Sequence, residues 1–152
     1  MMLRVVMVCS GNTCRSPMAE VFFRQMVDEA GGVSAPGLEG VEVASAGVFA
    51  GAGQPASEEA KAVAAEYGAE LNGHRSTPLT REAVTEADLI YTMTDAHRNA
   101  VLAMAPEAKG KTQRLDPRAD IADPFGGTTD AYRDTAEQIR TALSSRIKEL
   151  NR

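Results

Sequence analysis

The residues with the clearest chemical potential lie near the start of the chain, in the sequence VCSGNTCRSP (residues 8–17). This segment follows the β-branched, apolar run of residues 3–8 and precedes residues with helical spacing, so it should connect a strand to a helix. Pro17 suits the first turn of that helix. Helix N-termini present unpaired amides and a partial positive charge, which bind phosphate well. We therefore expect an anion-binding loop here.

Within this loop, the spacing Cys-x5-Arg-Ser predicts a nucleophile and a phosphate clamp. Arg15 offers a planar fork of donors that can hold two phosphoryl oxygens. The positive potential of the loop favours the thiolate of Cys9, which is the nucleophilic form of cysteine, and Ser16 can hydrogen-bond that sulfur. Gly11 should let the backbone amides turn inward around the anion. Alone, Cys9 would suggest a buried thiol and Arg15 a surface charge, but the combined motif favours thiolate attack on phosphorus.

The second cysteine, Cys14, has two interpretations that the sequence leaves open. It is either a core thiol on the first helical turn or a redox partner that forms a reversible disulfide with Cys9 and protects it from over-oxidation. A zinc site is not expected, because Cys-x4-Cys with the distant His74 and His97 fits no zinc-ligand spacing. We expect no metal and no cofactor, since the loop amides and Arg15 can neutralise the transition state.

Attack by a thiolate also requires an acid that protonates the leaving group. The segment DPRADIADPFGG (residues 116–127) supplies three candidates, which are Asp116, Asp120 and Asp123. Asp-Pro pairs are common turn formers, so any of them can be structural. Spacing alone does not choose among the three.

The elements that must position these residues alternate along the chain. We expect strands over residues 3–8, 41–45, 89–91 and 111–115, and helices over residues 17–26, 57–67, 80–87, 95–106 and 129–150. Ser57, Thr80 and either Thr94 or Asp95 should cap three of the helices. Loops should fill residues 31–40, 46–55 and 116–127. Strands alternating with helices predict an α/β domain with a mostly parallel sheet, whose ligand binds beyond the carboxyl ends of the strands.

Length and composition narrow the class of protein. The chain has 152 residues, of which 43% are hydrophobic and 24% charged, as in ordinary globular domains. Its net charge of −5 argues against binding to nucleic acid or an anionic membrane. No apolar run is long enough to span a bilayer, and residues 5–8 are too short for a signal-peptide core. We expect one cytoplasmic domain over residues 1–152, acting as a monomer.

The segment CSGNTCRSPMAE (residues 9–20) resembles the phosphate loop of the low-molecular-weight protein-tyrosine-phosphatase family. SAGVF (residues 45–49) and DPF (residues 123–125) are similar to further segments of that family. The resemblance covers essentially the whole chain. It implies a three-layer α/β fold in which a four-stranded parallel sheet is flanked by helices on both faces.

The resemblance also implies a role for each site residue. Cys9 is the nucleophile that forms a phospho-cysteine intermediate, Arg15 is the phosphate clamp, and Asp123 is the general acid and then the general base. The residues implied to bind phosphate are Ser10, Gly11, Asn12, Thr13, Cys14 and Ser16. The residues implied to form the hydrogen-bond network that shapes the loop are Asn12, Ser16, Ser45 and His74.

Within the family, two features point toward phosphoarginine and away from phosphotyrosine. Thr13 stands where phosphotyrosine enzymes usually have an aliphatic residue, and Phe125 is followed by Gly126 where they usually carry a second aromatic. Both features resemble the bacterial protein-arginine phosphatase branch, as do Phe49 and residues 76–80. We therefore expect Thr13, Phe49 and Phe125 to determine substrate specificity.

Guanidine chemistry agrees with this expectation. The pKa of a free guanidine is about 12.5 or more, so it leaves poorly unless it is protonated. A carboxylate at Asp123 can both orient a guanidinium and protonate its departing nitrogen. The expected partners are phosphorylated proteins as substrates, with inorganic phosphate and other oxyanions as inhibitors.

Three alternatives remain at this stage. The first is hydrolysis of phosphotyrosine by the same thiolate mechanism. The second is an arsenate reductase, a class that relays oxidation through later cysteines, whereas this chain has no cysteine after Cys14. The third is an inactive phosphate-binding domain, against which Cys9, Arg15 and a nearby acid argue together.

Overall fold

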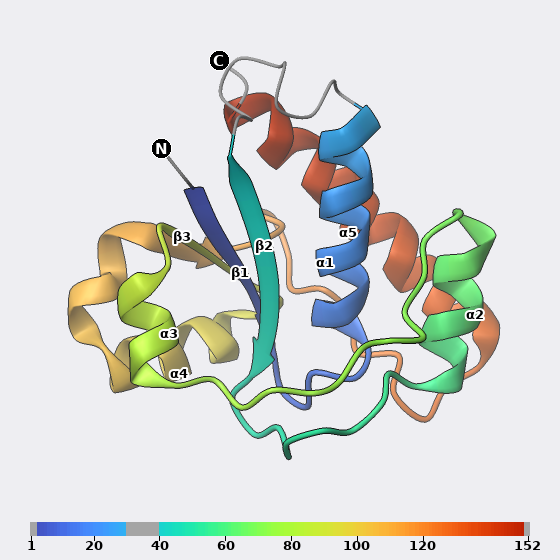
Figure 1. Cartoon of the computed structure of the whole chain (residues 1–152), viewed down its shortest axis with the longest axis horizontal. Helices are drawn as coiled ribbons and strands as arrows, with labels where there is room; N and C mark the ends of the chain where they lie inside the picture. Colours follow the sequence, from blue (N-terminus) through green and yellow to red (C-terminus); the bar gives the residue numbers. More distant parts are fainter. Residues whose placement is uncertain (1–2, 30–39, 151–152) are drawn as a thin grey trace.

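A computed structural model describes residues 3–29 and 40–150. The loop expected over residues 31–40 lies, apart from Gly40, outside these ranges. In the described part, the chain forms a four-stranded parallel sheet with the order β2-β1-β3-β4 (Figure 1). The strands are β1 (Leu3–Cys9), β2 (Val41–Gly47), β3 (Leu89–Thr92) and β4 (Thr112–Arg114).

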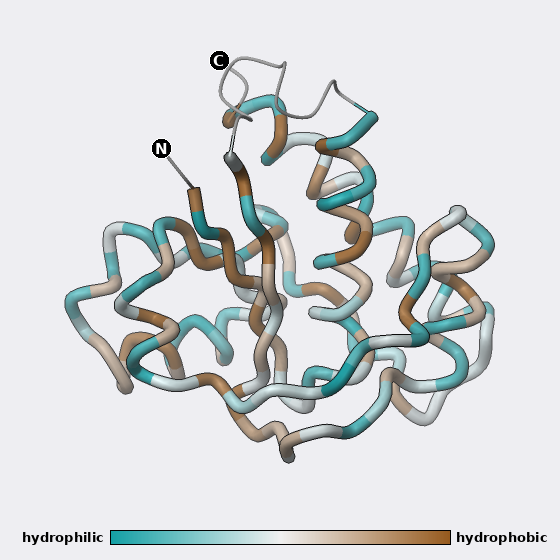
Figure 2. Tube along the Cα trace, in the orientation of Figure 1, coloured by the Kyte–Doolittle hydropathy of each residue, from teal (hydrophilic) through white to brown (hydrophobic). Residues whose placement is uncertain are grey.

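β1 lies inside the sheet and is buried along most of its length. Its side chains alternate between two apolar clusters, with Val5 and Met7 in one and Val6 and Val8 in the other. A parallel strand covered on both faces needs such a continuous apolar run. The run makes β1 largely brown, and so hydrophobic, in Figure 2.

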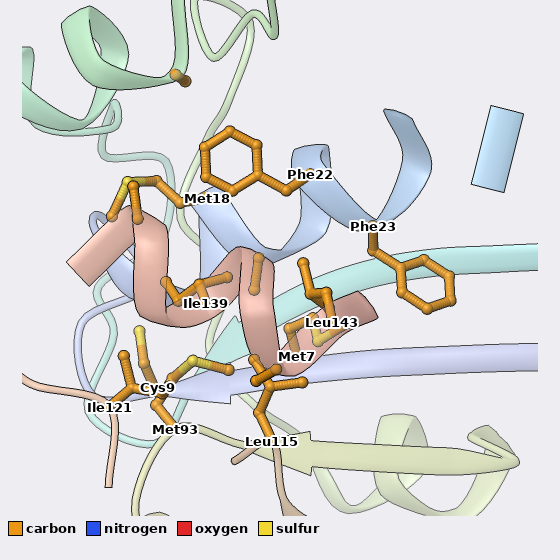
Figure 3. Packing of buried hydrophobic residues seen from close by; sticks show 14 of the residues in the cluster. Met7, Cys9, Met18, Phe22, Phe23, Met93, Leu115, Ile121, Ile139 and Leu143 are labelled. Atoms are coloured by element: carbon orange, nitrogen blue, oxygen red, sulfur yellow. The ribbon is translucent and has the colours of Figure 1, made fainter. Parts of the chain in front are cut away.

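One face of the sheet is covered by α1 (Arg15–Glu29) and α5 (Thr129–Leu150), and α2 (Glu58–Glu66) packs against both of these helices, away from the sheet (Figure 1). Side chains from these helices, such as Phe22 and Ile139, enclose the first cluster together with β1 (Figure 3). This cluster ends at the carboxyl edge of the sheet and forms one wall of the candidate site.

The other face is covered by α3 (Arg81–Glu86), α4 (Asp95–Met104) and a short 3-10 helix, η2 (Pro106–Lys111). Val84 and Val101 bury the second cluster there. The prediction of a three-layer α/β fold with four parallel strands is therefore confirmed. Across the described ranges, every helix is too short or too polar to span a bilayer.

Three helices begin at side-chain caps expected from the sequence, which are Ser57, Thr80 and Thr94. The first helix differs, since it begins at Arg15 rather than near Pro17. Pro17 lies within the first turn of α1, where a missing N–H costs no helical bond, and the Met18 N–H reaches the Cys14 carbonyl oxygen at 3.2 Å across it. Arg15 and Ser16 therefore stand in the first turn of α1, where helix amides face an anion.

Candidate active site

The loop between β1 and α1 lies at the carboxyl end of the sheet, where ligands bind in open α/β folds. It borders a cleft of about 300 Å³. The cleft is lined by residues from segments far apart in the sequence, which are Cys9, Ser10, Gly11, Thr13, Cys14, Arg15, Phe49, Gly51, Asp123 and Phe125. A larger hollow of about 540 Å³ beside β1 and β2 is lined by no cysteine or histidine, so the candidate chemistry lies in the smaller cleft.

Cys9 ends β1, and its side chain is buried at the edge of the first cluster (Figure 3). Its Sγ lies 2.9 Å from Ser16 Oγ. The Asn12 backbone N–H also donates to this sulfur, with the nitrogen 3.3 Å away. Polar groups that converge on one sulfur stabilise negative charge there, which suits a thiolate as nucleophile and as leaving group.

The Asn12 side chain holds the loop in shape and sets the direction of its hydrogen bonds. Its Nδ2 lies 2.8 Å from Ser16 Oγ and 3.0 Å from Ser45 Oγ. Its Oδ1 accepts the Thr77 N–H at 2.8 Å. Because a backbone N–H can only donate, this bond fixes the amide with both Nδ2 protons toward the serines. Ser16 therefore accepts from Asn12, and its own proton is directed to Cys9 Sγ.

Ser45 and His74 extend this network away from the cleft. Ser45 Oγ donates to the Glu20 carboxylate at 2.6 Å, and His74 Nε2 donates to the Asn12 carbonyl oxygen at 2.7 Å. The structure thus brings together the four residues that the resemblance assigned to the network. Glu20 and Thr77 join them, although the sequence analysis gave neither a role.

The loop backbone turns at Asn12, and the prediction that Gly11 provides this turn is wrong. Asn12 has a φ of 57°, in the left-handed region that asparagine tolerates better than most residues. Gly11 lacks a positive φ, and a Cβ there would meet only Thr13 Oγ1 at 3.8 Å, an ordinary contact. The glycine that the loop requires is Gly47 of β2, because a Cβ there would lie 3.0 Å from the Asn12 nitrogen and would collide with the Ser10 carbonyl oxygen.

Arg15 and Asp123 meet at the cleft. Arg15 is only 6% exposed, and its guanidinium donates to the Ile121 carbonyl oxygen at 3.0 Å. Another guanidinium nitrogen lies 3.5 Å from Asp123 Oδ2, while Asp123 Oδ1 accepts the Phe125 N–H at 3.1 Å. The Asp123 side chain is 55% exposed. Arg15 thus ties the acid loop, residues 116–127, to the phosphate loop and leaves the carboxylate accessible to a ligand.

The other two candidate acids do not line the cleft. Asp116 accepts hydrogen bonds from its own loop and from α5. Asp120 accepts the Asp95 N–H at 2.9 Å and pairs with Arg114 at 3.2 Å. The Asp95 N–H, helped by Arg114, lowers the pKa of Asp120, so this carboxyl is ionised and poorly suited to donate a proton. Of the three, only Asp123 lines the cleft.

Comparison with known proteins agrees with this geometry. Residues 4–152 match the family described as low molecular weight phosphotyrosine protein phosphatase. The chain belongs to this family. Its cleft at the carboxyl end of the sheet is lined by both the Cys-x5-Arg loop and the Asp-Pro loop.

Both arginine and tyrosine phosphatases are among the similar proteins. One named protein-arginine-phosphatase, from Geobacillus stearothermophilus, is 40% identical over an alignment that covers 97% of this chain and 95% of the relative. The low molecular weight protein-tyrosine-phosphatase Etp of Escherichia coli (strain K12) is 36% identical, over 97% of this chain and 95% of Etp. A structure of the YwlE arginine phosphatase, a mutant with a phosphorylated active-site serine, matches with a TM-score of 0.89 at 34% identity, over 97% of this chain and 95% of that one.

In this phosphatase-family chain, the rim of the cleft carries two exposed aromatic rings. Phe49 is 87% exposed and Phe125 is 73% exposed, and both line the cleft with Thr13. Gly126, which follows Phe125, has a φ of 79°, a conformation that disfavours a second aromatic side chain at that position. The three predicted specificity residues thus surround the mouth of one cleft.

Cys14 is a buried free thiol, as is Cys9. Its Sγ lies 3.4 Å from the Tyr132 hydroxyl and 3.7 Å from Ser57 Oγ. Burial, together with the bond to Cys14, raises the pKa of Tyr132 to about 12, so its hydroxyl stays protonated. Cys14 also lines the cleft. It has the neighbours of a core thiol and the location of a redox partner, and both interpretations stay predictions.

His97 also contacts the phosphate loop, although the sequence suggested no role for it beyond a zinc ligand, which its spacing excluded. His97 Nε2 lies 2.8 Å from Ser10 Oγ of the phosphate loop, although 87 positions separate the two residues. The only local signal was its place three residues after the cap Thr94. Among the described residues, no cluster of three or more histidine, cysteine or carboxylate side chains is arranged to hold a metal ion.

Proposed function

We propose that this chain is a protein-arginine phosphatase that works through a phospho-cysteine at Cys9. One observation carries the mechanism: the Cys9 sulfur receives hydrogen bonds from Asn12 and Ser16 in the same cleft where Arg15 meets Asp123. Similarity to proteins named as arginine phosphatases supports the choice of substrate.

In the first step, the Cys9 thiolate attacks the phosphorus of phosphoarginine. The P–S bond forms and the P–N bond breaks, while Asp123, as a carboxylic acid, gives its proton to the departing guanidino nitrogen. The phosphoryl oxygens are held by Arg15 and by the amides of residues 10–16. A substrate that binds as the positively charged phosphoguanidinium then releases its arginine as a guanidinium, whereas without the Asp123 proton the strongly basic free guanidine would have to leave.

In the second step, water attacks the phospho-cysteine. Asp123, now a carboxylate, takes a proton from this water, the P–S bond breaks, and inorganic phosphate leaves. Cys9 departs as a thiolate, which the directed proton of Ser16 and the N–H of Asn12 stabilise. A YwlE mutant with a phosphorylated active-site serine supports a covalent intermediate of this kind.

The rim supports phosphoarginine as the substrate. A guanidinium is flat and polar, so it fits between Phe49 and Phe125 and can be oriented by the Asp123 carboxylate. The hydroxyl of Thr13 offers a polar contact beside these rings. Gly126 leaves one side of the mouth without a second aromatic ring.

Phosphotyrosine is the second candidate, and the same two rings favour it. Phe49 and Phe125 are exposed phenyl rings at one cleft, and aromatic rings stack favourably on the ring of an aromatic ligand. The tyrosine phosphatase Etp is almost as similar to this chain as the arginine phosphatase is. The mechanism at Cys9 would be the same for either substrate.

The deciding measurement is kcat/KM on peptides of identical sequence that carry phosphoarginine or phosphotyrosine, both followed by phosphorus NMR near neutral pH because the P–N bond is acid-labile. A clear preference for phosphoarginine supports the proposal, and a clear preference for phosphotyrosine replaces the substrate but keeps the mechanism. The Cys9→Ser variant should bind phosphate without turning over either peptide. Wild-type activity in that variant would disprove the thiolate mechanism.

We further propose a cytoplasmic monomer in which residues 1–152 form one phosphatase domain, without a metal ion or cofactor. A nucleophilic thiol at Cys9 stays usable only while reduced, and the cytosol provides that condition. The partners are phosphorylated proteins, with phosphate and other oxyanions as competitive inhibitors, and neither nucleic acid nor a membrane. Sedimentation analysis tests whether the protein is a monomer, and inhibition constants for phosphate test whether oxyanions compete with the substrate.

A further inference from the structure

His97 is a buried histidine that is built into the start of α4 and also contacts the phosphate loop. It is 5% exposed. The ring nitrogen Nδ1 accepts the Thr94 backbone N–H at 3.2 Å, and the backbone N–H of His97 donates to Thr94 Oγ1 at 3.1 Å. The two residues therefore form a capping box. The ring is therefore held in place by a helix that belongs to the opposite layer from α1.

This anchoring fixes the tautomer of His97. A backbone N–H can only donate, so Nδ1 must accept and carries no proton. A neutral imidazole then has its proton on Nε2. Since Nε2 lies 2.8 Å from Ser10 Oγ, the ring donates and the serine oxygen accepts. The hydroxyl proton of Ser10 is left free to point elsewhere.

The charge state of His97 agrees with this assignment. Burial, helped by the nearby positive charge of Arg15, lowers the pKa of His97 to about 4, against weaker opposing effects of Asp120 and Asp123. The ring is therefore neutral near pH 7. A protonated ring would place a second N–H against the Thr94 amide and would lose the capping bond.

Ser10 lines the cleft, and within residues 3–29 and 40–150 its hydroxyl has His97 as its only hydrogen-bond partner. We propose that His97 is a positioning residue, which fixes the Ser10 hydroxyl so that its proton points into the cleft toward a phosphoryl oxygen. The inference rests on the proposed phosphatase function. By this proposal the Ser10 hydroxyl becomes a further hydrogen-bond donor of the phosphate site, and its orientation depends on His97 in α4, on the opposite face of the sheet from α1.

Two substitutions separate the two bonds of His97. In His97→Asn, the amide oxygen can take the place of Nδ1 and keep the Thr94 cap, but nothing reaches Ser10. In His97→Gln, the longer amide can take the place of Nε2 and donate to Ser10, but the cap is lost. The Asn variant should lose about fivefold or more in kcat/KM and in affinity for inorganic phosphate, as expected for one lost hydrogen bond, while its Tm stays near that of wild type.

The Gln variant should show the reverse, with a lower Tm and with kcat/KM and phosphate affinity largely rescued. The coupling between the two residues is tested in a Ser10→Ala variant. Replacing His97 by Asn in that variant should cause no further loss of kcat/KM or of phosphate affinity. Additive losses, or losses in both His97 variants that follow Tm alone, would overturn the proposal and leave His97 with a purely structural role. If wild-type protein hydrolyses neither phosphopeptide, the proposed function fails, but the phosphate affinities of the same variants still decide the role of His97.

Discussion

Replacing Asn12 by alanine should destabilise the protein far more than most single substitutions. The change removes three side-chain hydrogen bonds, which join Asn12 to Ser16 and Ser45 in buried surroundings and to the Thr77 N–H in a partly buried one. At about 1 kcal/mol each, these bonds amount to about 3 kcal/mol. Alanine at the φ of 57° adds about 1 kcal/mol of steric cost.

The expected loss is therefore about 4 kcal/mol, which in a domain of this size lowers Tm by about 8–16 °C. Chemical denaturation gives the free energy directly. Asn12→Gly is the matched control, because it loses the same bonds but accepts the left-handed backbone, so it should be more stable than the alanine variant. Both variants should also lose most of their kcat, since nothing then directs the Ser16 proton to Cys9. An alanine variant within about 1 kcal/mol of wild type would refute the assigned network.

The remaining predictions concern protons and redox state. Asp123→Asn should lower kcat on phosphoarginine peptides by about a hundredfold or more while KM changes little, as expected for loss of a general acid; Asp116→Asn is the control, and an equal loss there would refute the assignment. Mild peroxide should join Cys9 to Cys14 reversibly, and mass spectrometry that finds only sulfinic or sulfonic Cys9 would remove the protective role of Cys14. His97 has a pKa of about 4 when folded and 6.5 as its ordinary value. Between these values the unfolded chain binds more protons than the folded protein. The free energy of unfolding should therefore fall by up to about 3 kcal/mol as the pH drops from 6.5 toward 4, and it should not change further above pH 6.5 on account of His97. In His97→Asn this part of the pH dependence of unfolding should be absent.

Much of the fold could be predicted because local patterns are strong. From Val5 to Cys9, β1 is a continuous apolar run, which is typical of a parallel strand with two covered faces. Ser57, Thr80 and Thr94 are caps with a local mechanism, and the structure places each at a helix start. The start of α1 could not be predicted to the residue, since a proline is tolerated at several positions of a first turn and the helix begins two residues before Pro17, at Arg15.

The phosphate-loop motif of the site could be predicted, but the distant residues that hydrogen-bond to this loop could not. Thr77 lies 65 positions from Asn12 and His97 lies 87 positions from Ser10, so their contacts depend on how the layers pack, which no local pattern encodes. The prediction for Gly11 failed for a different reason. It assigned the turn by residue type, whereas an asparagine whose side chain is fully bonded can hold the left-handed backbone itself.

The cleft divides into a buried floor and an exposed rim, and the two parts carry different functions. Cys9 and Ser16 are buried and tied to several elements, so substitutions there disturb the fold as well as the chemistry. Phe49 and Phe125 are exposed and make few demands on packing. Rim substitutions should therefore shift the ratio of kcat/KM between phosphoarginine and phosphotyrosine without lowering stability. Relatives of nearly equal identity, 40% and 36%, are named for different substrates, so overall similarity cannot replace the matched-peptide measurement.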